Sequence, residues 1–318
     1  MEALLSTLDG IIWSQWLVFL CLGAGVYFTA VTLFMQVRCI PDMIRQISRG
    51  ESSESGISSF QSLMISLAGR VGVGNIAGVS TAIAFGGPGA VFWMWIVAFL
   101  GSATSFIECT LAQIYKERDL DTKEYRGGPA YYIEKAYSHT AARPFALVYA
   151  IIFAICMILA TSYFLPGIQA NGVASAVENA WGVNTTISAV VMAVLLGFII
   201  IGGVKRIANF ASMVVPFMAV LYIIFAIVIM IMNADQIPHV FGMIFNAAFD
   251  REAAFSGMLG AAIMWGVKRG IYSNEAGQGT GPQSAAAAEV SHPAKQGFVQ
   301  SFAVYIDTLF VCTATAFI

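Results

Sequence analysis

The chain of 318 residues is 58% hydrophobic and only 11% charged, whereas an ordinary soluble domain has about 25% charged residues. Its formal net charge is −2 and it has no basic face or stripe, so we expect no nucleic-acid partner. The apolar residues form runs long enough to cross a hydrocarbon core, which takes about 20 helical residues. The composition therefore predicts a polytopic, all-α membrane protein surrounded by a lipid bilayer.

The apolar runs and the polar breaks between them predict eight membrane spans. No Lys or Arg precedes the first run, so it lacks the basic segment of a secretory signal, and we expect it to stay in the mature protein. Pro166, within the fourth run, predicts a bend. The last run has no polar residue after it, and we therefore expect a truncated chain. The predicted spans lie at about 11–37, 60–84, 90–115, 144–177, 185–201, 210–232, 253–270 and 297–318.

The Lys and Arg residues lie almost entirely in alternate loops. Of the 16 basic residues, only Arg70 and Arg251 lie outside the first, third, fifth and seventh loops between the predicted spans. Loops that are rich in Lys and Arg stay in the cytoplasm of the cell. We therefore expect the N-terminus of the chain to lie outside.

The second predicted span is interrupted by glycines. Gly69, Gly72 and Gly74 lie near its middle, together with Arg70 and Asn75. Each glycine costs about 1 kcal/mol of helix stability relative to alanine, and an arginine at that depth costs about 2.5–3.5 kcal/mol on insertion scales. Such a span must be packed within protein or line a cavity, where unwound backbone is tolerated. The break would offer helix N–H groups to a carboxylate and carbonyl oxygens to a cation.

Helix packing is the alternative explanation of these glycines. Gly74 and Gly78 form a small-xxx-small motif, which brings two membrane helices close together. Spacing alone leaves the packing seam and the binding site equally favoured.

A second polar, glycine-rich segment, 273–284, lies at the cytoplasmic end of the seventh span. Because it lacks the GxxxxGK[ST] pattern of a phosphate-binding loop, we interpret it as a gate or hinge.

Seven segments along nearly the whole chain carry a recognisable pattern. They are Ala68–Val79, Gly86–Trp95, Phe106–Ala112, Gly127–Glu134, Gln169–Asn171, Gly266–Gly277 and Ile306–Thr308. In this order they resemble the alanine/glycine:cation symporter family, the sodium:alanine symporters or amino acid carrier proteins. Its members are sodium-coupled carriers of small amino acids.

The resemblance implies an inverted-repeat fold of the leucine-transporter type, within the APC superfamily. In that fold, two inverted five-helix repeats enclose a site at the middle of the membrane. The family is similar to it with one additional N-terminal helix, here 11–37. Within a single transmembrane domain, 1–318, the first repeat would be 60–232, and 253–318 would begin an incomplete second repeat. The last three core helices would lie beyond the end of this chain.

The resemblance also implies where the substrate binds. The backbone at Gly72, Val73 and Gly74 would hold the substrate, with the side chains of Asn75 and Gln169 beside it. The carboxamide oxygen of Asn75 would also ligate sodium, with hydrogen bonding between helices as the alternative role.

Two further sets of residues complete the predicted site. The carbonyl groups of Ala68 and Val71 correspond to a second sodium site of this fold. Repeat symmetry also predicts an interrupted helix in the seventh span. Met264, Trp265 and Gly266 of that span would form the opposite wall, with Trp265 closing the site over a small side chain. The alternative role of Trp265 is that of an interfacial anchor.

Four ionisable residues are predicted in or near the spans, namely Arg70, Glu108, Glu275 and Asp307. Buried charges of opposite sign tend to pair, so we expect Arg70 to be partnered by Glu275 or Asp307 rather than by the substrate. We interpret the four as structural or gating residues. A proton relay through Glu108 or Asp307 is the alternative.

The residues and the resemblance together predict a secondary active transporter. It would carry alanine or glycine into the cell with sodium by alternating access, in the plasma membrane of a bacterium or archaeon. It would need no cofactor besides the co-transported sodium ion. The predicted spans contain no histidine and no nucleophile–base pair, so we expect no enzymatic activity. The alternatives are a proton-coupled amino acid transporter and a truncated, non-transporting membrane subunit.

Overall fold

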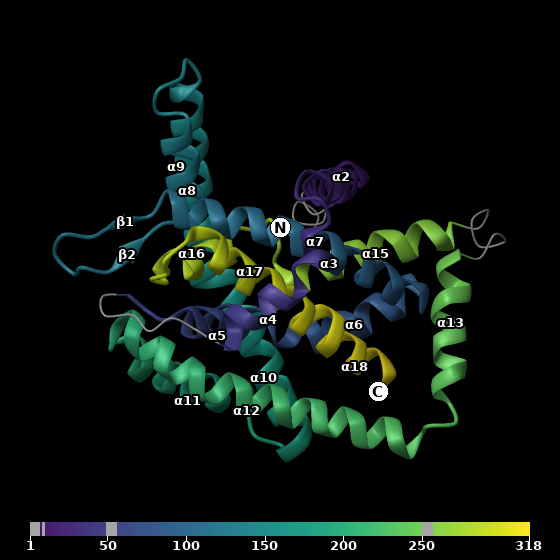
Figure 1. The fold of residues 1–318 in the computed structure, drawn as a ribbon. Coiled ribbons are helices and arrows are strands. Elements are labelled where there is room, and N and C mark those ends of the chain that lie inside the picture. The colour runs from purple at the N-terminus through teal and green to yellow at the C-terminus, as the bar shows by residue number, and fades with distance from the viewer. Residues whose placement is uncertain (1–6, 8–9, 49–55, 250–256) are drawn as a thin grey trace.

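The computed structural model describes residues 7, 10–48, 56–249 and 257–318, and these residues are almost entirely helical (Figure 1). Among them, a short antiparallel hairpin pairs β1 (Glu117–Arg118) with β2 (Tyr125–Arg126). The helices before the hairpin are α2 (Gln15–Val31), α3 (Met35–Arg38), α4 (Ile40–Ser48), α5 (Ser59–Arg70), α6 (Val73–Gly86) and α7 (Gly89–Ile114). The helices after it are α8 (Pro129–Ala136), α9 (Arg143–Leu159), the π-helical η1 (Ala160–Phe164), α10 (Leu165–Trp181), α11 (Thr185–Ile200), α12 (Gly203–Met232), α13 (Ile237–Phe249), α15 (Met258–Asn274), α16 (Thr280–Ala287), α17 (Pro293–Val304), the π-helical η2 (Tyr305–Cys312) and α18 (Thr313–Phe317).

In the described part of the chain, four helices are long and apolar enough to cross a membrane, and the bent pair α5–α6 is a fifth candidate. The four are α7, the continuous helix α9–α10, α12 and the continuous helix α17–α18. They confirm the prediction of a helical membrane protein. The predicted spans 11–37, 185–201 and 253–270 correspond to the shorter helices α2, α11 and α15, which have 17, 16 and 17 residues. Length and composition therefore support five of the eight predicted spans.

The first predicted span, 11–37, is not helical along its whole length. α2 ends before Leu33 and Phe34, whose left-handed backbone has φ angles of 54° and 55°. The side-chain amide of Gln36 then donates to the hydroxyl of Thr29 at 2.8 Å across the turn. This turn directs the chain away from α2, and α4 packs against α17. Apolar composition continues through the turn, which is why it predicts one longer element.

The fourth predicted span is one helix of 39 residues. Its middle turn, η1, is π-helical and ends two residues before Pro166. Proline has no N–H group, and its ring crowds the preceding turn of a helix. The hydroxyls of Thr161 and Ser162 donate to the carbonyls of Met157 and Ile158 at 2.8 and 2.5 Å. The irregularity that Pro166 predicts is therefore this wider π turn.

The helix α13 lies between the sixth and seventh predicted spans, where the sequence predicts a loop. Its residues Phe245 and Phe249 pack on Phe92 of α7, with ring centroids 5.6 and 4.7 Å apart. Gly89 of α7 permits this approach, because a Cβ there would lie 2.7 Å from the backbone of Ala247. Apolar residues recur in this segment at helical spacing, at positions 237, 240, 241, 244, 245 and 248.

The helix α7 is the centre of the bundle, and α2, α13, α15, α16 and α17 all pack against it. α15 approaches α7 closely, because a Cβ at Gly266 would lie 2.5 Å from the carbonyl oxygen of Ala90. Small residues allow membrane helices to pack closely in this way.

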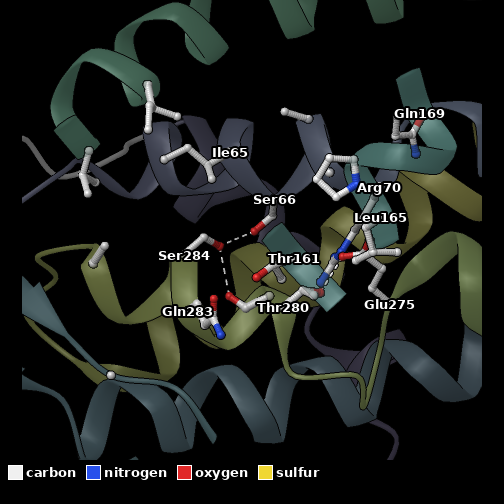
Figure 2. Close-up of a pocket in the computed structure, with 18 of the residues that line it drawn as sticks. Ile65, Ser66, Arg70, Thr161, Leu165, Gln169, Glu275, Thr280, Gln283 and Ser284 are labelled. Carbon is white, nitrogen blue, oxygen red and sulfur yellow. Dashed lines mark hydrogen bonds between the residues drawn. The ribbon is translucent and has the colours of Figure 1, made fainter. Parts of the chain in front are cut away.

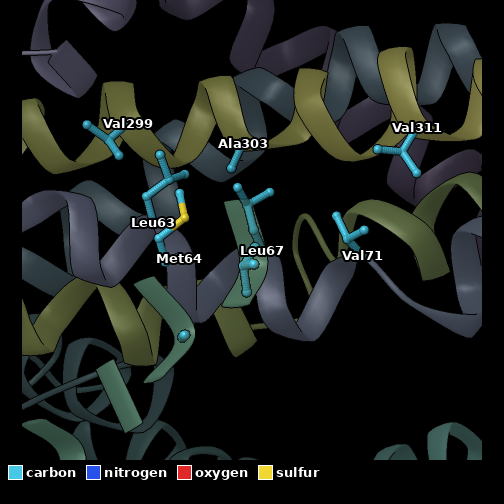
Figure 3. Close-up of a cluster of buried hydrophobic side chains, with 9 residues drawn as sticks. Leu63, Met64, Leu67, Val71, Val299, Ala303 and Val311 are labelled. Atoms are coloured by element: carbon cyan, nitrogen blue, oxygen red, sulfur yellow. The ribbon is translucent and has the colours of Figure 1, made fainter. Parts of the chain in front are cut away.

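A buried hydrophobic cluster holds α5 between α12 and α17 (Figure 3). Its α5 side comprises Leu63, Met64 and Leu67, which continue to Val71 just beyond the helix. Its other members come from α12, α17 and η2: Ala211, Val215, Val299, Ala303 and Val311. The cluster fixes the first half of the broken span beside the helix that carries Asp307.

The hairpin and α13 lie at opposite ends of the bundle. The β1–β2 hairpin contacts α16 at one end, and α13 lies at the opposite end (Figure 1). The basic residues Arg118 and Arg126 of the hairpin therefore lie far from α13.

Candidate functional site

The second predicted span is broken where the glycines predict. α5 ends at Arg70, Val71 is extended, and α6 begins at Val73 after a bend of 41°. The N–H of Gly72 donates to Asn75 Oδ1 at 3.2 Å, and the N–H of Val73 donates to Gln169 Oε1 at 3.0 Å. The N–H groups of Gly72 and Val73, at the start of α6, therefore donate to side-chain oxygens.

Two glycines at this break are required by close neighbours. A Cβ at Gly72 would lie 2.6 Å from Gln169 Oε1, and a Cβ at Gly74 would lie 3.0 Å from the ring of Tyr272. The glycines therefore bring the backbone of α6 against α10 on one side and α15 on the other. These close contacts agree with the packing explanation of the glycines, and the break in the helix agrees with the binding explanation.

The helix carbonyls before the break have lost their usual partners. In a continuous helix the N–H of Gly72 would donate to the carbonyl of Ala68, but here it donates to the side chain of Asn75. The N–H of Asn75 likewise donates to the carbonyl of Gly72 at 3.1 Å, and not to that of Val71. The two carbonyls that the resemblance assigns to sodium are therefore released from regular helical bonding.

The second break lies further along the chain than predicted. α15 is a continuous helix from Met258 to Asn274, so the predicted interruption of the seventh span does not fall at Met264–Gly266. Gly266 serves the close packing of α15 on α7, because a Cβ there would also lie 2.6 Å from the Cβ of Trp93.

The chain instead leaves the helical conformation between α15 and α16. Glu275, Gly277 and Gly279 have φ angles of 54°, 85° and 88°. A positive φ is uncommon for a residue with a side chain, and glycine adopts it freely. The segment 273–284, interpreted from the sequence as a gate or hinge, therefore contains the second break.

The two breaks meet at a cavity of about 550 Å³ (Figure 2). Figure 2 shows Gln169 at one end of it and Arg70 beside Glu275. The cavity takes its lining from α5, α6, α10, α12, α15, α16 and the hairpin. Its polar lining residues include Ser66, Arg70, Thr161, Gln169, Tyr272, Glu275, Thr280, Gln283 and Ser284.

Met264 and Trp265 do not reach this cavity. They line another one, of about 510 Å³, together with Trp13 and Trp16 near α2. The ring of Trp265 stacks on Phe85, with the ring centroids 5.0 Å apart. The wall opposite the first break is formed instead by residues at the end of α15.

The side chain of Asn75 is fully buried behind the first break. Its amide group donates to Ser273 Oγ and to the carbonyl of Asp307, both at 2.9 Å. Ser273 in turn lies within hydrogen-bond distance of Thr308 Oγ1, at 3.1 Å, and Thr308 donates to the carboxylate of Asp307. The breaks are thus joined to η2 by a buried cluster of oxygen-bearing side chains.

The four ionisable residues come together at the breaks. Arg70 Nη1 lies 3.9 Å from Asp307 Oδ2, and neither side chain has any exposed surface, so the predicted partnership with an acid is present. Glu275 accepts a hydrogen bond from Thr280, and Glu108 accepts one from the N–H of Gly277 at 3.1 Å. Two of the three carboxylates therefore hold the second break in place.

Comparison with known proteins identifies the family of the chain. A family model described as the sodium:alanine symporter family matches residues 1–318. The chain belongs to the sodium:alanine symporter family. The family is one of transporters and not of enzymes, which confirms the expectation of no enzymatic activity.

Curated relatives of this symporter family match along most or all of the chain. The putative sodium/proton-dependent alanine carrier protein YrbD of Bacillus subtilis is 55% identical over 317 residues, which cover 100% of this chain and 64% of the relative. The sodium/proton-dependent alanine carrier protein of Bacillus sp. strain PS3 is 50% identical over 275 residues, 86% of this chain and 59% of the relative. The sodium/alanine symporter AgcS of Methanococcus maripaludis is 41% identical over 320 residues, 99% of this chain and 70% of the relative. The chain thus spans about 64% of the length of the Bacillus subtilis relative.

Sequence reasoning missed three residues that lie at or beside the two breaks. Tyr272, Ser273 and Thr308 were not singled out, although all three lie within the segments that carry the family resemblance. Their signal was the run of polar residues that ends the seventh span and the hydroxyl that follows Asp307. The contacts of Tyr272 with Gly74, of Ser273 with Asn75 and of Thr308 with Ser273 become visible only in three dimensions.

Proposed function

We propose that this protein carries small neutral amino acids, alanine and glycine, into the cell together with sodium by alternating access. The observation that carries the proposal is the meeting of two helix breaks at one cavity beside Gln169. Such breaks place N–H groups and carbonyl oxygens, which lack helical partners, in the middle of a membrane bundle. The names of the three relatives, each of which includes both sodium and alanine, support the proposal.

The substrate carboxylate binds at the N-terminus of α6. There the N–H of Val73 points at the side-chain oxygen of Gln169, which occupies the position of a carboxylate oxygen. When a carboxylate takes this position, Gln169 rotates and donates its amide group to the substrate. The ring of Tyr272, packed against Gly74, limits the side chain of the substrate to that of a small amino acid.

Sodium binds on both sides of the first break. It is a hard cation that takes oxygen ligands, and Asn75, Ser273, Thr308 and Asp307 supply such oxygens in one buried cluster. Asn75 Oδ1 accepts one hydrogen bond from Gly72 and keeps a second lone pair for the ion. A second ion binds at the released carbonyl groups of Ala68 and Val71.

The arrangement of breaks supports an inverted-repeat fold of the leucine-transporter type. The first break falls in the first helix of the repeat 60–232, and the second break falls in the first helix of the repeat that begins at 253. Within the 11–37 segment, α2 is the additional N-terminal helix of a single domain. The separation of the hairpin residues Arg118 and Arg126 from α13 supports a cytoplasmic hairpin and an external N-terminus, in the plasma membrane.

The buried charges act as structural and gating residues around the second break. Glu108 holds the N–H of Gly277, and Glu275 holds Thr280 at the start of α16. Breaking these bonds would let α16 move relative to α7 and open the cavity toward the hairpin end.

Binding of radiolabelled alanine to the purified protein tests the proposal. We expect binding in sodium chloride and none in potassium chloride at the same ionic strength. Replacement of Asn75 by alanine should raise the sodium concentration for half-maximal binding about tenfold, as expected for the loss of one ligand to a charged group. Asn171→Ala, an exposed position on α10, is the matched control. Equal binding in sodium and potassium would contradict sodium coupling.

A further inference from the structure

The contact between Arg70 and Asp307 is incomplete. Their closest nitrogen and oxygen are 3.9 Å apart, whereas a charge-assisted N–H···O bond measures about 2.7–2.9 Å. Within the described part of the chain, no guanidinium nitrogen of Arg70 has a hydrogen-bond partner, and neither does Asp307 Oδ2. Both side chains are fully buried, so two charges face each other without the bonds that normally compensate for burial.

The other buried carboxylates are already engaged. Glu108 accepts from the N–H of Gly277, and Glu275 accepts from Thr280. Oδ1 of Asp307 accepts from Thr308, which leaves Oδ2 as the carboxylate oxygen that faces the guanidinium. Arg70 therefore lies where it can compensate the negative charge of Asp307, whose carboxylate is within ion-pair distance of the guanidinium.

The side chain of Arg70 lies at the edge of the cavity where the two breaks meet. It lines this cavity, which measures about 550 Å³. Gly281 of α16 lets the guanidinium pack closely against the helix, because a Cβ there would lie 2.6 Å from Arg70 Nη2. The guanidinium therefore lies between Asp307 on one side and the cavity on the other, so that a change of its side-chain rotamer would move it toward or away from Asp307.

We propose that Arg70 is a positioning residue that pairs with the Asp307 carboxylate when the co-transported cation has left and withdraws from it when the cation binds. This inference rests on the proposed function, in which Asp307 belongs to the sodium cluster. A buried carboxylate without any counter-charge is strongly unfavourable, and it would retain the cation. The pairing with Arg70 therefore allows the cation to leave and the empty carrier to return across the membrane.

Two transport modes in proteoliposomes separate this role from a structural one. Net uptake of labelled alanine down a sodium gradient requires the empty carrier to return. Exchange of labelled for unlabelled alanine, with equal sodium on both sides, requires only the loaded carrier to move. For Arg70→Gln, we expect net uptake to fall at least about tenfold while exchange stays within about twofold of wild type, because only the empty carrier holds an unpaired carboxylate.

Three further measurements complete the test. The sodium concentration for half-maximal exchange should decrease in Arg70→Gln, because the arginine no longer competes with the ion. Arg70→Lys keeps the charge and should restore part of the net uptake. Arg45→Gln, at an exposed position on α4, should leave both modes unchanged.

A parallel loss of exchange and net uptake in folded Arg70→Gln protein would overturn the inference, and so would unchanged net uptake. If the glutamine variant does not fold, Arg70→Lys decides, because its shorter reach should lower net uptake and leave exchange intact. Wild-type protein without sodium-dependent uptake would instead overturn the proposed function.

Discussion

The side-chain oxygen of Gln169 accepts a hydrogen bond from the backbone N–H of Val73 at 3.0 Å, so a side chain of α10 completes the first turn of α6. The contact joins α6 to α10, and its two residues are 96 positions apart in the sequence. It closes the break of the second span from the side on which the substrate is proposed to bind. Residues on both sides of this contact therefore give direct tests of the account.

Replacement of Gln169 by alanine should weaken binding of alanine. A hydrogen bond to a charged group contributes about 1.5–3 kcal/mol, so the dissociation constant should rise about 10-fold to 150-fold. Gln169→Glu should weaken binding further, because it places a negative charge beside the substrate carboxylate. Equilibrium binding of labelled alanine measures both effects. Asn171→Ala on the same helix is the control, and unchanged binding by both Gln169 variants would exclude this residue from the site.

Replacement of Gly72 by alanine should weaken substrate binding by displacing the side chain of Gln169. The added Cβ would lie 2.6 Å from Gln169 Oε1, so this side chain would have to turn away from the N–H of Val73. Gly167→Ala is the matched control on α10, because nothing lies within 4 Å of its Cβ position. Binding of alanine and the melting temperature in detergent should both decrease for Gly72→Ala alone. Normal binding by this variant would show that the contact is not required.

Replacement of Ser62 by alanine should destabilise the folded protein. Its hydroxyl donates to the carbonyl of Ser284 at 2.7 Å and accepts from the side-chain amides of Gln296 and Gln300 at 2.8 and 3.3 Å. Leaving these buried groups unsatisfied should cost about 1–3 kcal/mol of the free energy of unfolding. Ser80→Ala, whose exposed hydroxyl bonds only within its own helix, is the control. Equal thermal stability of the two variants would contradict this assignment.

The stability of the protein should depend on pH through Lys116, which lies beyond the end of α7. Burial lowers the pKa of Lys116 from 10.5 to about 8, and the Glu289 carboxylate opposes this shift. Between these two values the unfolded chain binds more protons than the folded protein, so the free energy of unfolding rises with pH. Partial exposure of the side chain makes this rise smaller than the full shift would give.

The variant Lys116→Met tests this pH dependence. Melting temperatures in detergent, measured at pH values below 8 and near 10, give the difference between wild type and variant. Wild type should gain stability relative to the variant as the pH rises. A constant difference across this range would show that Lys116 does not titrate there.

The first break was predictable because its signal is local. Gly72 and Gly74 lie beside a charged Arg70 within an apolar run, and each of these residues disfavours a lipid-facing helix. Because buried charges of opposite sign tend to pair, the sequence predicts Glu275 or Asp307 as the partner of Arg70. The structure identifies Asp307 as the one within ion-pair distance.

The second break could not be placed from glycines alone. Gly266 lies inside a regular helix, where it permits close packing on Ala90 of α7. The break falls instead at Glu275 and the two glycines after it, a segment whose polarity predicted only a hinge. Whether a glycine marks a break or a packing contact depends on its neighbours from other helices, which the sequence does not place.

Sodium-driven uptake of labelled alanine into proteoliposomes tests the central claim most directly. The account predicts accumulation under an inward sodium gradient, and no accumulation when a pH gradient of either direction replaces it. Accumulation should fall in Asn75→Ala and stay unchanged in Asn171→Ala. Uptake that follows the pH gradient, or that takes place equally without sodium, would contradict the account.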